Sequence, residues 1–159
     1  MTSLLQLDDL SLRFVIGDNE VPVVRGVDLS ISKGEIVGLV GESGCGKSVT
    51  CMAAMGLLDD TSKLGGDVFW KGQKIKPTND AAMSTLRGNE MAMIFQDPMS
   101  ALNPVKRIGK QLTEAIRINS PSRFGGSALR DRAIQLLRDV GVPEPEKRLS
   151  NYPHQLSGG

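Results

Sequence analysis

The sequence predicts an α/β protein of 159 residues, in which a β-rich first part is followed by a helical second part. Three observations support this prediction. Apolar and polar residues alternate within the first 32 residues, a continuous apolar run precedes a glycine-rich loop, and apolar residues recur at helical spacing after Pro98. We therefore expect an α/β core over residues 1–96 and a helical subdomain over residues 97–159.

The first two predicted strands cover residues 10–14 and 27–31, where every second residue is apolar. A turn is expected between them at residues 17–19. The apolar runs IVGLV, residues 36–40, and MAMIF, residues 91–95, are almost continuous, which is typical of strands buried on both faces.

A further strand, turn and strand are predicted for DVFWKGQKI, which follows Gly65-Gly66, with Lys71-Gly72 at the apex. The expected helices cover Val49–Leu58, which Asp59 and Asp60 would end, and two later segments with apolar residues at helical spacing. These two segments are residues 108–116 and residues 129–140, separated by Gly125-Gly126 and closed by Gly141 and Pro143.

The net charge of +1 gives no global electrostatic argument for a nucleic-acid or membrane partner. The charge is unevenly distributed, because residues 1–60 hold 4 basic and 9 acidic residues whereas residues 61–159 hold 15 and 9. We interpret the basic second half as a solvated helical surface, with a phosphate-binding or partner-binding surface as the alternative. No apolar run approaches the length of about 18 residues that a membrane helix needs, and the start MTSLLQLDDL, which carries acids where a secretion signal carries bases, is not expected to be such a signal.

The stretch GESGCGKS, Gly41 to Ser48, matches the phosphate-loop pattern Gly-x-x-x-x-Gly-Lys-Ser between a predicted strand and a predicted helix. Glycines let successive backbone N–H groups converge on phosphate oxygens, and the helix N-terminus adds a positive dipole. Lys47 would contact the phosphates of ATP and Ser48 would bind Mg²⁺. The expected nucleotide-binding residues are Gly41, Glu42, Ser43, Gly44, Cys45, Gly46, Lys47, Ser48 and Val49.

Cys45 occupies a tolerant position of the loop and is interpreted as a small filler residue. The alternative is that its alkylation would crowd the phosphates and that ATP would protect it. Cys45 and Cys51 lack the spacing of a redox or zinc site, so reduced thiols are expected.

Two residues outside the loop are candidates for the same site. Phe14 lies 27 residues before Gly41 and could stack on adenine, although a strand phenylalanine is more often a core residue. Gln96 lies 49 residues after Lys47, and its amide could touch Mg²⁺ or the attacking water. The alternative interpretation gives the Mg²⁺-binding role to Asp97, which ends the apolar strand.

The chain closes on LSGG, Leu156 to Gly159. With this stretch, the order of motifs resembles the ATP-binding subunits of ABC transporters. The stretches VGESGCGKS, IFQDPMSALNP and YPHQLSGG are similar to the oligopeptide, dipeptide and nickel importer branch. The resemblance covers essentially the whole chain. It implies a phosphate-loop NTPase core with an N-terminal antiparallel β subdomain and a helical subdomain.

The resemblance also implies that ATP is held by the phosphate loop of one subunit and the signature, Ser157, Gly158 and Gly159, of a second ATP-binding subunit. Implied partners are integral membrane permease subunits at the cytoplasmic face and, indirectly, an extracytoplasmic substrate-binding protein. The acidic strand, catalytic glutamate and switch histidine of the family do not occur here, and His154 is not expected to be the switch. We expect an incomplete subunit that is inactive alone.

The alternative from another class is a soluble ABC ATPase that acts on nucleic acid or ribosomes. The undivided layout and the SALNP stretch favour transport, with no nucleic-acid partner. A third interpretation is a binding module without turnover. The sequence does not identify the transported substrate.

Overall fold

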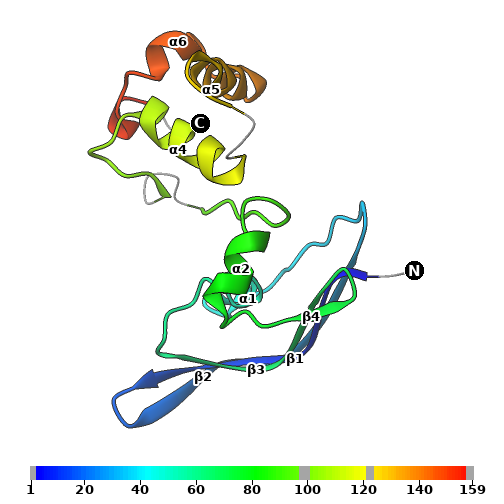
Figure 1. Cartoon of the computed structure of the whole chain (residues 1–159). Helices are drawn as coiled ribbons and strands as arrows, with labels where there is room; N and C mark the ends of the chain where they lie inside the picture. Colours follow the sequence, from blue (N-terminus) through cyan, green and yellow to red (C-terminus); the bar gives the residue numbers. More distant parts are fainter. Residues whose placement is uncertain (1–2, 97–100, 121–123, 157–159) are drawn as a thin grey trace. The chain divides into compact units, whose positions relative to one another are not determined.

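The computed structural model describes residues 3–96, 101–120 and 124–156 (Figure 1). The chain divides into two compact units, Met1–Met91 and Ala92–Gly159, which we call the first and second units. The division expected from the sequence lies after residue 96.

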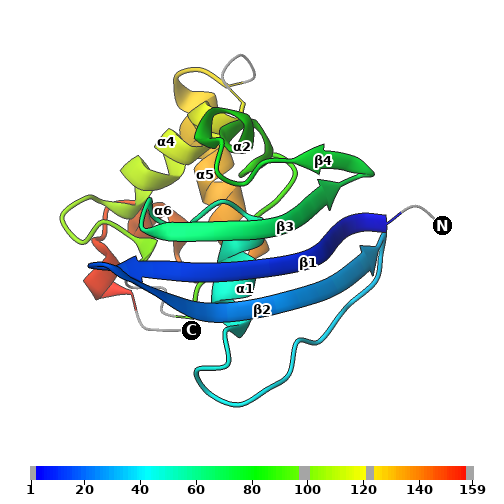
Figure 2. The same cartoon turned by 90° about the horizontal axis from the view of Figure 1, so that it is seen from below.

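The first unit is built on a four-stranded antiparallel sheet, shown across its width in Figure 2. Its strand order is β2-β1-β3-β4, and the turn between β1 and β2 contains Gly17 at φ 61°. The predicted antiparallel strands and the hairpin at Lys71-Gly72 are thus confirmed. The strand bounds are β1 Ser3–Ile16, β2 Asn19–Ser32, β3 Ser62–Trp70 and β4 Gln73–Ile75.

An irregularity in β1 shapes the core of the first unit. Leu7 and Leu10 are both buried in one apolar cluster, although residues three apart in a regular strand face opposite sides. The pairing registers with β2 and β3 shift between these residues, and Asp9 adopts φ 47°. The bulge therefore returns Leu10 to the face that Leu7 already occupies.

Helix α1, Lys47–Ala54, covers this face of the sheet (Figure 2). Ala53 and Ala54 pack with Leu7 and Leu10 in the core. The expected extension of this helix to Leu58 is wrong, because Gly56 at φ 62° ends the helical path soon after Ala54. The sequence did not predict α2, Asp80–Leu86, which begins where the Asn79 side chain accepts a hydrogen bond from the Ala82 N–H.

The two expected fully buried strands, residues 36–40 and residues 91–95, are not strands in this structure. The side chains of Ile36, Val40 and Ile94 are 98%, 93% and 97% exposed. A strand buried on both faces needs hydrogen-bonded neighbours and a cover on each side. Within the described residues, no named strand pairs with either run, so most of their apolar side chains face solvent, although Met91 is buried.

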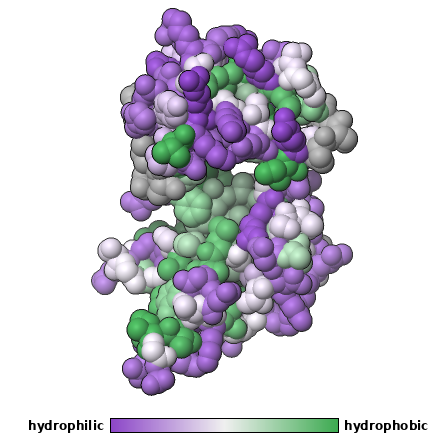
Figure 3. Space-filling model, turned by 60° about the vertical axis from the view of Figure 1, so that its left-hand side comes forward, coloured by the Kyte–Doolittle hydropathy of each residue, from purple (hydrophilic) through white to green (hydrophobic). Residues whose placement is uncertain are grey.

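The second unit is helical, as predicted. Its elements are α4 Ile108–Asn119, α5 Ser127–Asp139, α6 Pro145–Arg148 and the short 3-10 helix η1 Pro153–Gln155. The last two were not predicted. Ala133, Ile134, Leu137 and Leu149 form its core cluster. On the face seen in Figure 3, hydrophilic side chains predominate over the helical unit.

Helix α4 begins against the segment that follows α6. The N–H groups of Ile108 and Gly109 donate to the carbonyls of Asn151 and Leu149, both at 2.9 Å. A Cβ at Gly109 would lie 2.8 Å from the Leu149 oxygen, so only glycine allows this close approach.

Among the described residues, no helix is long and apolar enough to cross a bilayer.

Candidate functional site

The phosphate-loop candidate, residues 41–48, leads directly into α1. Gly44 and Gly46 adopt φ values of 83° and 92°, a conformation that favours glycine. Gly46 is also buried, and a Cβ there would lie 3.2 Å from the Val23 carbonyl oxygen of β2. These two glycines therefore allow the loop to curl beside the sheet and to start the helix at Lys47.

The N-terminus of α1 leaves backbone donors available for an anion. The Gly46 carbonyl accepts two hydrogen bonds, from the Thr50 N–H at 2.8 Å and from the Thr50 hydroxyl at 2.9 Å. Within the described residues, no acceptor is found for the N–H groups of residues 47–49. Three unpaired donors at the positive end of a helix form the arrangement that binds phosphate.

Lys47 reaches back across the loop. Its ammonium group donates to the carbonyl oxygens of Gly41, at 2.8 Å, and Glu42, at 2.6 Å, and lies 3.5 Å from the Cys45 sulfur. Its half-buried side chain holds a positive charge beside the same loop that presents the free N–H groups. A mobile cation and a set of backbone donors can together bind a phosphate chain.

Ser48 is the candidate Mg²⁺ ligand of the loop. Its side chain is exposed, and in the part of the chain that the structure describes its hydroxyl has no hydrogen-bond partner. A free serine oxygen next to a phosphate site is compatible with a hard cation that also binds phosphate oxygens. The described residues contain no group of three or more His, Cys, Asp or Glu side chains that could hold a metal by themselves.

The other expected site residues are less fully placed. Phe14 is half-buried in β1, between its register partners Val21 and Ser62, and stays a prediction for adenine. Gln96 is exposed in a bend of the second unit, and its position relative to the loop is not determined. Asp97 and Ser157 to Gly159 lie outside the described residues.

His154 lies in η1 and its ring stacks on Tyr152, with a centroid separation of 5.7 Å. Its side chain is exposed. This contact is local, between residues two apart. The interpretation of His154 as an exposed residue, and not as the switch, stays a prediction.

Thr50, which is not among the residues expected from the sequence, supports the loop. Thr50 is buried, and its hydroxyl closes the first turn of α1 onto Gly46. Only the position of the hydroxyl, four residues after a glycine at the start of a helix, could have indicated this contact. Thr50 is a support for the loop rather than a group that contacts phosphate.

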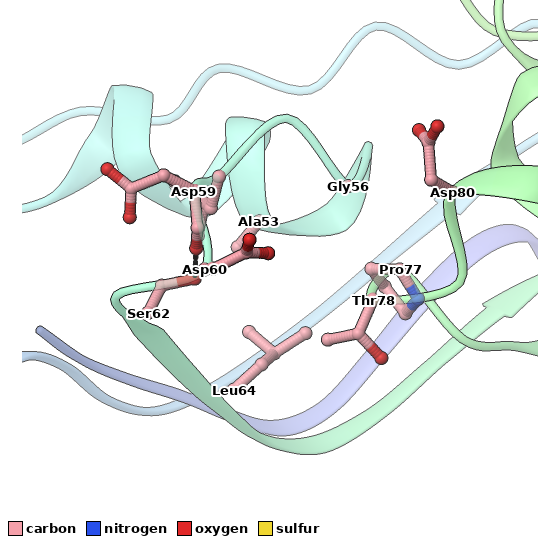
Figure 4. A pocket seen from close by; sticks show the side chains of 10 residues that line it. Ala53, Gly56, Asp59, Asp60, Ser62, Leu64, Pro77, Thr78 and Asp80 are labelled. Carbon is pink, nitrogen blue, oxygen red and sulfur yellow. Dashed lines mark hydrogen bonds between the residues drawn. The ribbon is translucent and has the colours of Figure 1, made fainter.

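A separate hollow of the first unit lies at the other end of α1 (Figure 4). It has a volume of about 540 Å³, and its acidic lining residues are Asp59, Asp60 and Asp80. Asp59 accepts hydrogen bonds from the N–H and hydroxyl of Thr61, and Asp80 forms an ion pair with Arg87. Asp59 and Asp80 are therefore engaged in local contacts, and we assign this hollow no function.

The antiparallel sheet, the helix behind it and the curled glycine loop together define a phosphate-loop nucleotide-binding protein. The chain belongs to the ABC transporter family, which matches residues 24–159. Relatives include the oligopeptide transport ATP-binding protein OppD of Mycobacterium tuberculosis, 43% identical over 159 residues, and the dipeptide transport ATP-binding protein DppD of Escherichia coli, 45% identical over 162 residues. The resemblance found in the sequence is confirmed.

The matches cover all of this chain and 26% of OppD, and 99% of this chain and 48% of DppD. The chain thus spans between a quarter and half of the length of these relatives. A solved structure described as a dimeric structure of MJ0796, a bacterial ABC transporter cassette, has a TM-score of 0.81 at 23% identity. The match covers 97% of this chain and 63% of that one. It supports the fold, which is an α/β ABC ATPase fold.

Proposed function

We propose that this chain is the ATP-binding part of a subunit that hydrolyses ATP to drive the import of peptides, with nickel as the alternative cargo, across the cytoplasmic membrane. The observation that carries the proposal is the curled loop at residues 41–48, with three free N–H groups and the Lys47 ammonium beside them. This chain is similar over nearly its whole length to parts of OppD and DppD, and this similarity supports peptides as the cargo.

The proposed roles follow from the chemistry of each group. Lys47 binds phosphate oxygens and stabilises the charge that develops during phosphoryl transfer. Ser48 binds Mg²⁺, and Gln96 contacts Mg²⁺ or the attacking water. Phe14 stacks on adenine, and Ser157, Gly158 and Gly159 contact the nucleotide of a second ATP-binding subunit. Permease subunits in the membrane respond to the closure of this dimer at their cytoplasmic face, and an extracytoplasmic substrate-binding protein delivers the cargo to them.

We further propose that the 159-residue chain binds nucleotide without sustained hydrolysis. The sequence has no residue at the positions that the resemblance gives to the catalytic glutamate and switch histidine. A bound water would then lack the base that removes its proton. Binding and turnover are thus separate expectations for this chain.

The first test is Mg²⁺-dependent ATP binding to the 159-residue chain, followed by calorimetry, together with a phosphate-release assay. Binding without release is expected, and absence of binding contradicts the proposal. The second test isolates the full-length protein from its native membrane. Co-purification of integral membrane subunits supports transport, whereas tight, salt-sensitive binding of RNA or DNA would favour the nucleic-acid alternative instead. The relatives reported above give that alternative no support.

A further inference from the structure

The second unit carries an excess of positive charge that the proposed function does not use. Its described part from residue 101 to residue 156 holds nine basic and five acidic residues. Four of the basic residues form ion pairs, namely Lys106, Arg132, Arg138 and Lys147. Within this described part, the remaining five basic residues have no ion-pair partner: Arg107, Lys110, Arg117, Arg130 and Arg148.

Three of these five unpaired residues line one hollow of about 300 Å³. Arg107 and Lys110 come from the start of α4, and Arg130 comes from the first turn of α5. Gly109, Thr113, Leu149 and Ser150 complete the wall, and no acidic residue lines it. We call this feature the basic hollow.

The neighbouring groups show which donors of the basic hollow are available. The guanidinium of Arg107 lies 5.8 Å from the centre of the Tyr152 ring, a contact that limits the freedom of its side chain without neutralising its charge. The Thr113 hydroxyl is already committed to the carbonyls of Gly109 and Lys110. In the described part of the chain, the hydroxyl of Ser150 has no recorded partner, so it remains a donor beside the three cations.

Backbone groups at the start of α4 do not contribute donors. The N–H groups of Ile108 and Gly109 are bonded to residues 151 and 149, and those of Lys110 and Gln111 to the Arg107 carbonyl. The charge of Arg130 acts on Glu146, which is already paired with Arg138. The basic hollow would therefore recognise a ligand through side-chain charge, which two guanidinium groups and one ammonium group supply.

We propose that the basic hollow binds the phosphate group of a small phosphate ester. Guanidinium groups match phosphate geometry with paired N–H donors, and lysine adds a mobile positive charge. A volume of about 300 Å³ is at the lower end for ligand pockets, which suits one phosphate group with a small substituent. The phosphate comes either from the headgroup of an anionic lipid or from a free small molecule, and both sources present the same oxyanion.

The first experiment follows the backbone amide resonances of the 159-residue chain by NMR during titration with inorganic phosphate. Chloride and acetate are compared at matched ionic strength. Saturable shifts at residues 107–113, 130 and 150 are expected with phosphate. Equal shifts with acetate, or no saturable shift at these residues, would overturn the proposal, because the site would then not be specific for phosphate.

The matched variants are Lys110→Gln/Arg130→Gln and, as a control with the same loss of charge, Lys76→Gln/Arg117→Gln. The first pair removes two groups of the hollow and should weaken phosphate binding there by about tenfold or more, since it removes charge-assisted hydrogen bonds. The control pair lies outside the hollow and should change the affinity less than about twofold. An equal loss in both variants contradicts a specific site. All four residues are exposed, and unchanged resonances elsewhere confirm the fold.

The second experiment separates the two sources of phosphate. Binding of the chain is measured by co-sedimentation with vesicles of phosphatidylcholine containing phosphatidic acid, and with phosphatidylcholine alone. Binding that requires phosphatidic acid and is lost in Lys110→Gln/Arg130→Gln assigns a lipid headgroup. Phosphate shifts without vesicle binding assign a free phosphate ester.

The basic hollow is tested independently of the nucleotide site. Phosphate binding at the loop is reported by the resonances of residues 41–48 and is expected to be weakened by Lys47→Ala. Shifts at the basic hollow should persist in that variant. Failure of either site is therefore visible without affecting the other measurement.

Discussion

The ammonium nitrogen of Lys47 lies 2.8 Å from the carbonyl oxygen of Gly41, six residues earlier. Together with the bond to Glu42, this contact closes the loop on itself. The carbonyl oxygens hold the cation beside the free N–H groups of α1. Phosphate oxygens would compete with these carbonyl oxygens for the same ammonium group.

Replacing Lys47 tests this arrangement. Lys47→Ala removes the mobile cation and should lower the affinity for ATP with Mg²⁺ by about tenfold or more, since hydrogen bonds to charged groups contribute about 1.5–3 kcal/mol. Lys47→Arg keeps the charge, so its affinity for ATP should lie between that of the unchanged chain and that of Lys47→Ala. Calorimetric titration measures both variants, with Lys76→Ala as an exposed control. An affinity that stays the same in Lys47→Ala would contradict the assignment of this loop.

Substitutions of two glycines of the loop distinguish the effect of backbone strain from that of steric crowding. Gly44→Ala places a side chain at positive φ with nothing within 4 Å, and should destabilise the first unit by about 1–2 kcal/mol. Gly46→Ala adds a Cβ 3.2 Å from the Val23 oxygen and should destabilise it more. Urea unfolding followed by Trp70 fluorescence gives both values. Equal losses would show that the approach to β2 carries no constraint.

Cys45 and Cys51 form an internal comparison, because both thiols are exposed. ATP should slow alkylation of Cys45, whose sulfur lies 3.5 Å from the Lys47 ammonium, and should leave Cys51 unprotected. Mass spectrometry after iodoacetamide treatment measures each site. In a Cys51→Ser background, full alkylation of Cys45 should weaken ATP binding by crowding the phosphates. Unchanged affinity after that modification refutes the prediction.

Protonation of Glu90 at low pH should change the fluorescence of Trp70, the single tryptophan. One carboxylate oxygen accepts hydrogen bonds from the Lys71 ammonium, at 2.7 Å, and from the Trp70 indole, at 2.6 Å, and these bonds lower the pKa of Glu90 below its usual 4.5. A lowered pKa means that the contact is intact above about pH 4.5 and is lost as the pH falls through the folded-state pKa. Trp70 fluorescence should therefore change below pH 4.5, and Glu90→Gln should remove that step. A step that persists in Glu90→Gln would assign it to another group.

At residues 36–40, the observed structure differs from the one expected from the sequence. Ile36 is 98% exposed, so Ile36→Ser should change the free energy of unfolding by less than about 0.5 kcal/mol and lower the binding of a hydrophobic dye. Leu10 is fully buried, and Leu10→Ala should cost about 2–5 kcal/mol. Both are measured by urea unfolding. A large loss in Ile36→Ser would mean that this run is buried after all.

The sequence predicts those parts of the fold whose pattern is local. Alternation of apolar residues locates β1 and β2, and Lys71-Gly72 locates the β3–β4 turn. The phosphate loop is also readable, because glycine at positions 44 and 46 meets a backbone requirement that other residues rarely satisfy. The bulge at Asp9 is not readable, since alternation alone places Leu7 and Leu10 on opposite faces.

Features that depend on distant neighbours could not be predicted. The runs 36–40 and 91–95 have the composition of buried strands, yet burial depends on partner strands and not on the run itself. The basic hollow depends on Lys110 in α4 and Arg130 in α5 meeting at one place, which their separation in the sequence conceals. The end of α1 depended on the conformation of Gly56 rather than on the acidic residues that follow it.

The close approach of Gly109 to Leu149 has a mechanical consequence. Two backbone hydrogen bonds and a contact that no Cβ could enter fasten the beginning of α4 to the residues after α6. A force applied to either segment is thus transmitted directly to the other. Residues 108–109 and 149–151, which are about forty residues apart in the chain, are thus attached to each other, and a larger side chain in place of Gly109 should weaken this attachment.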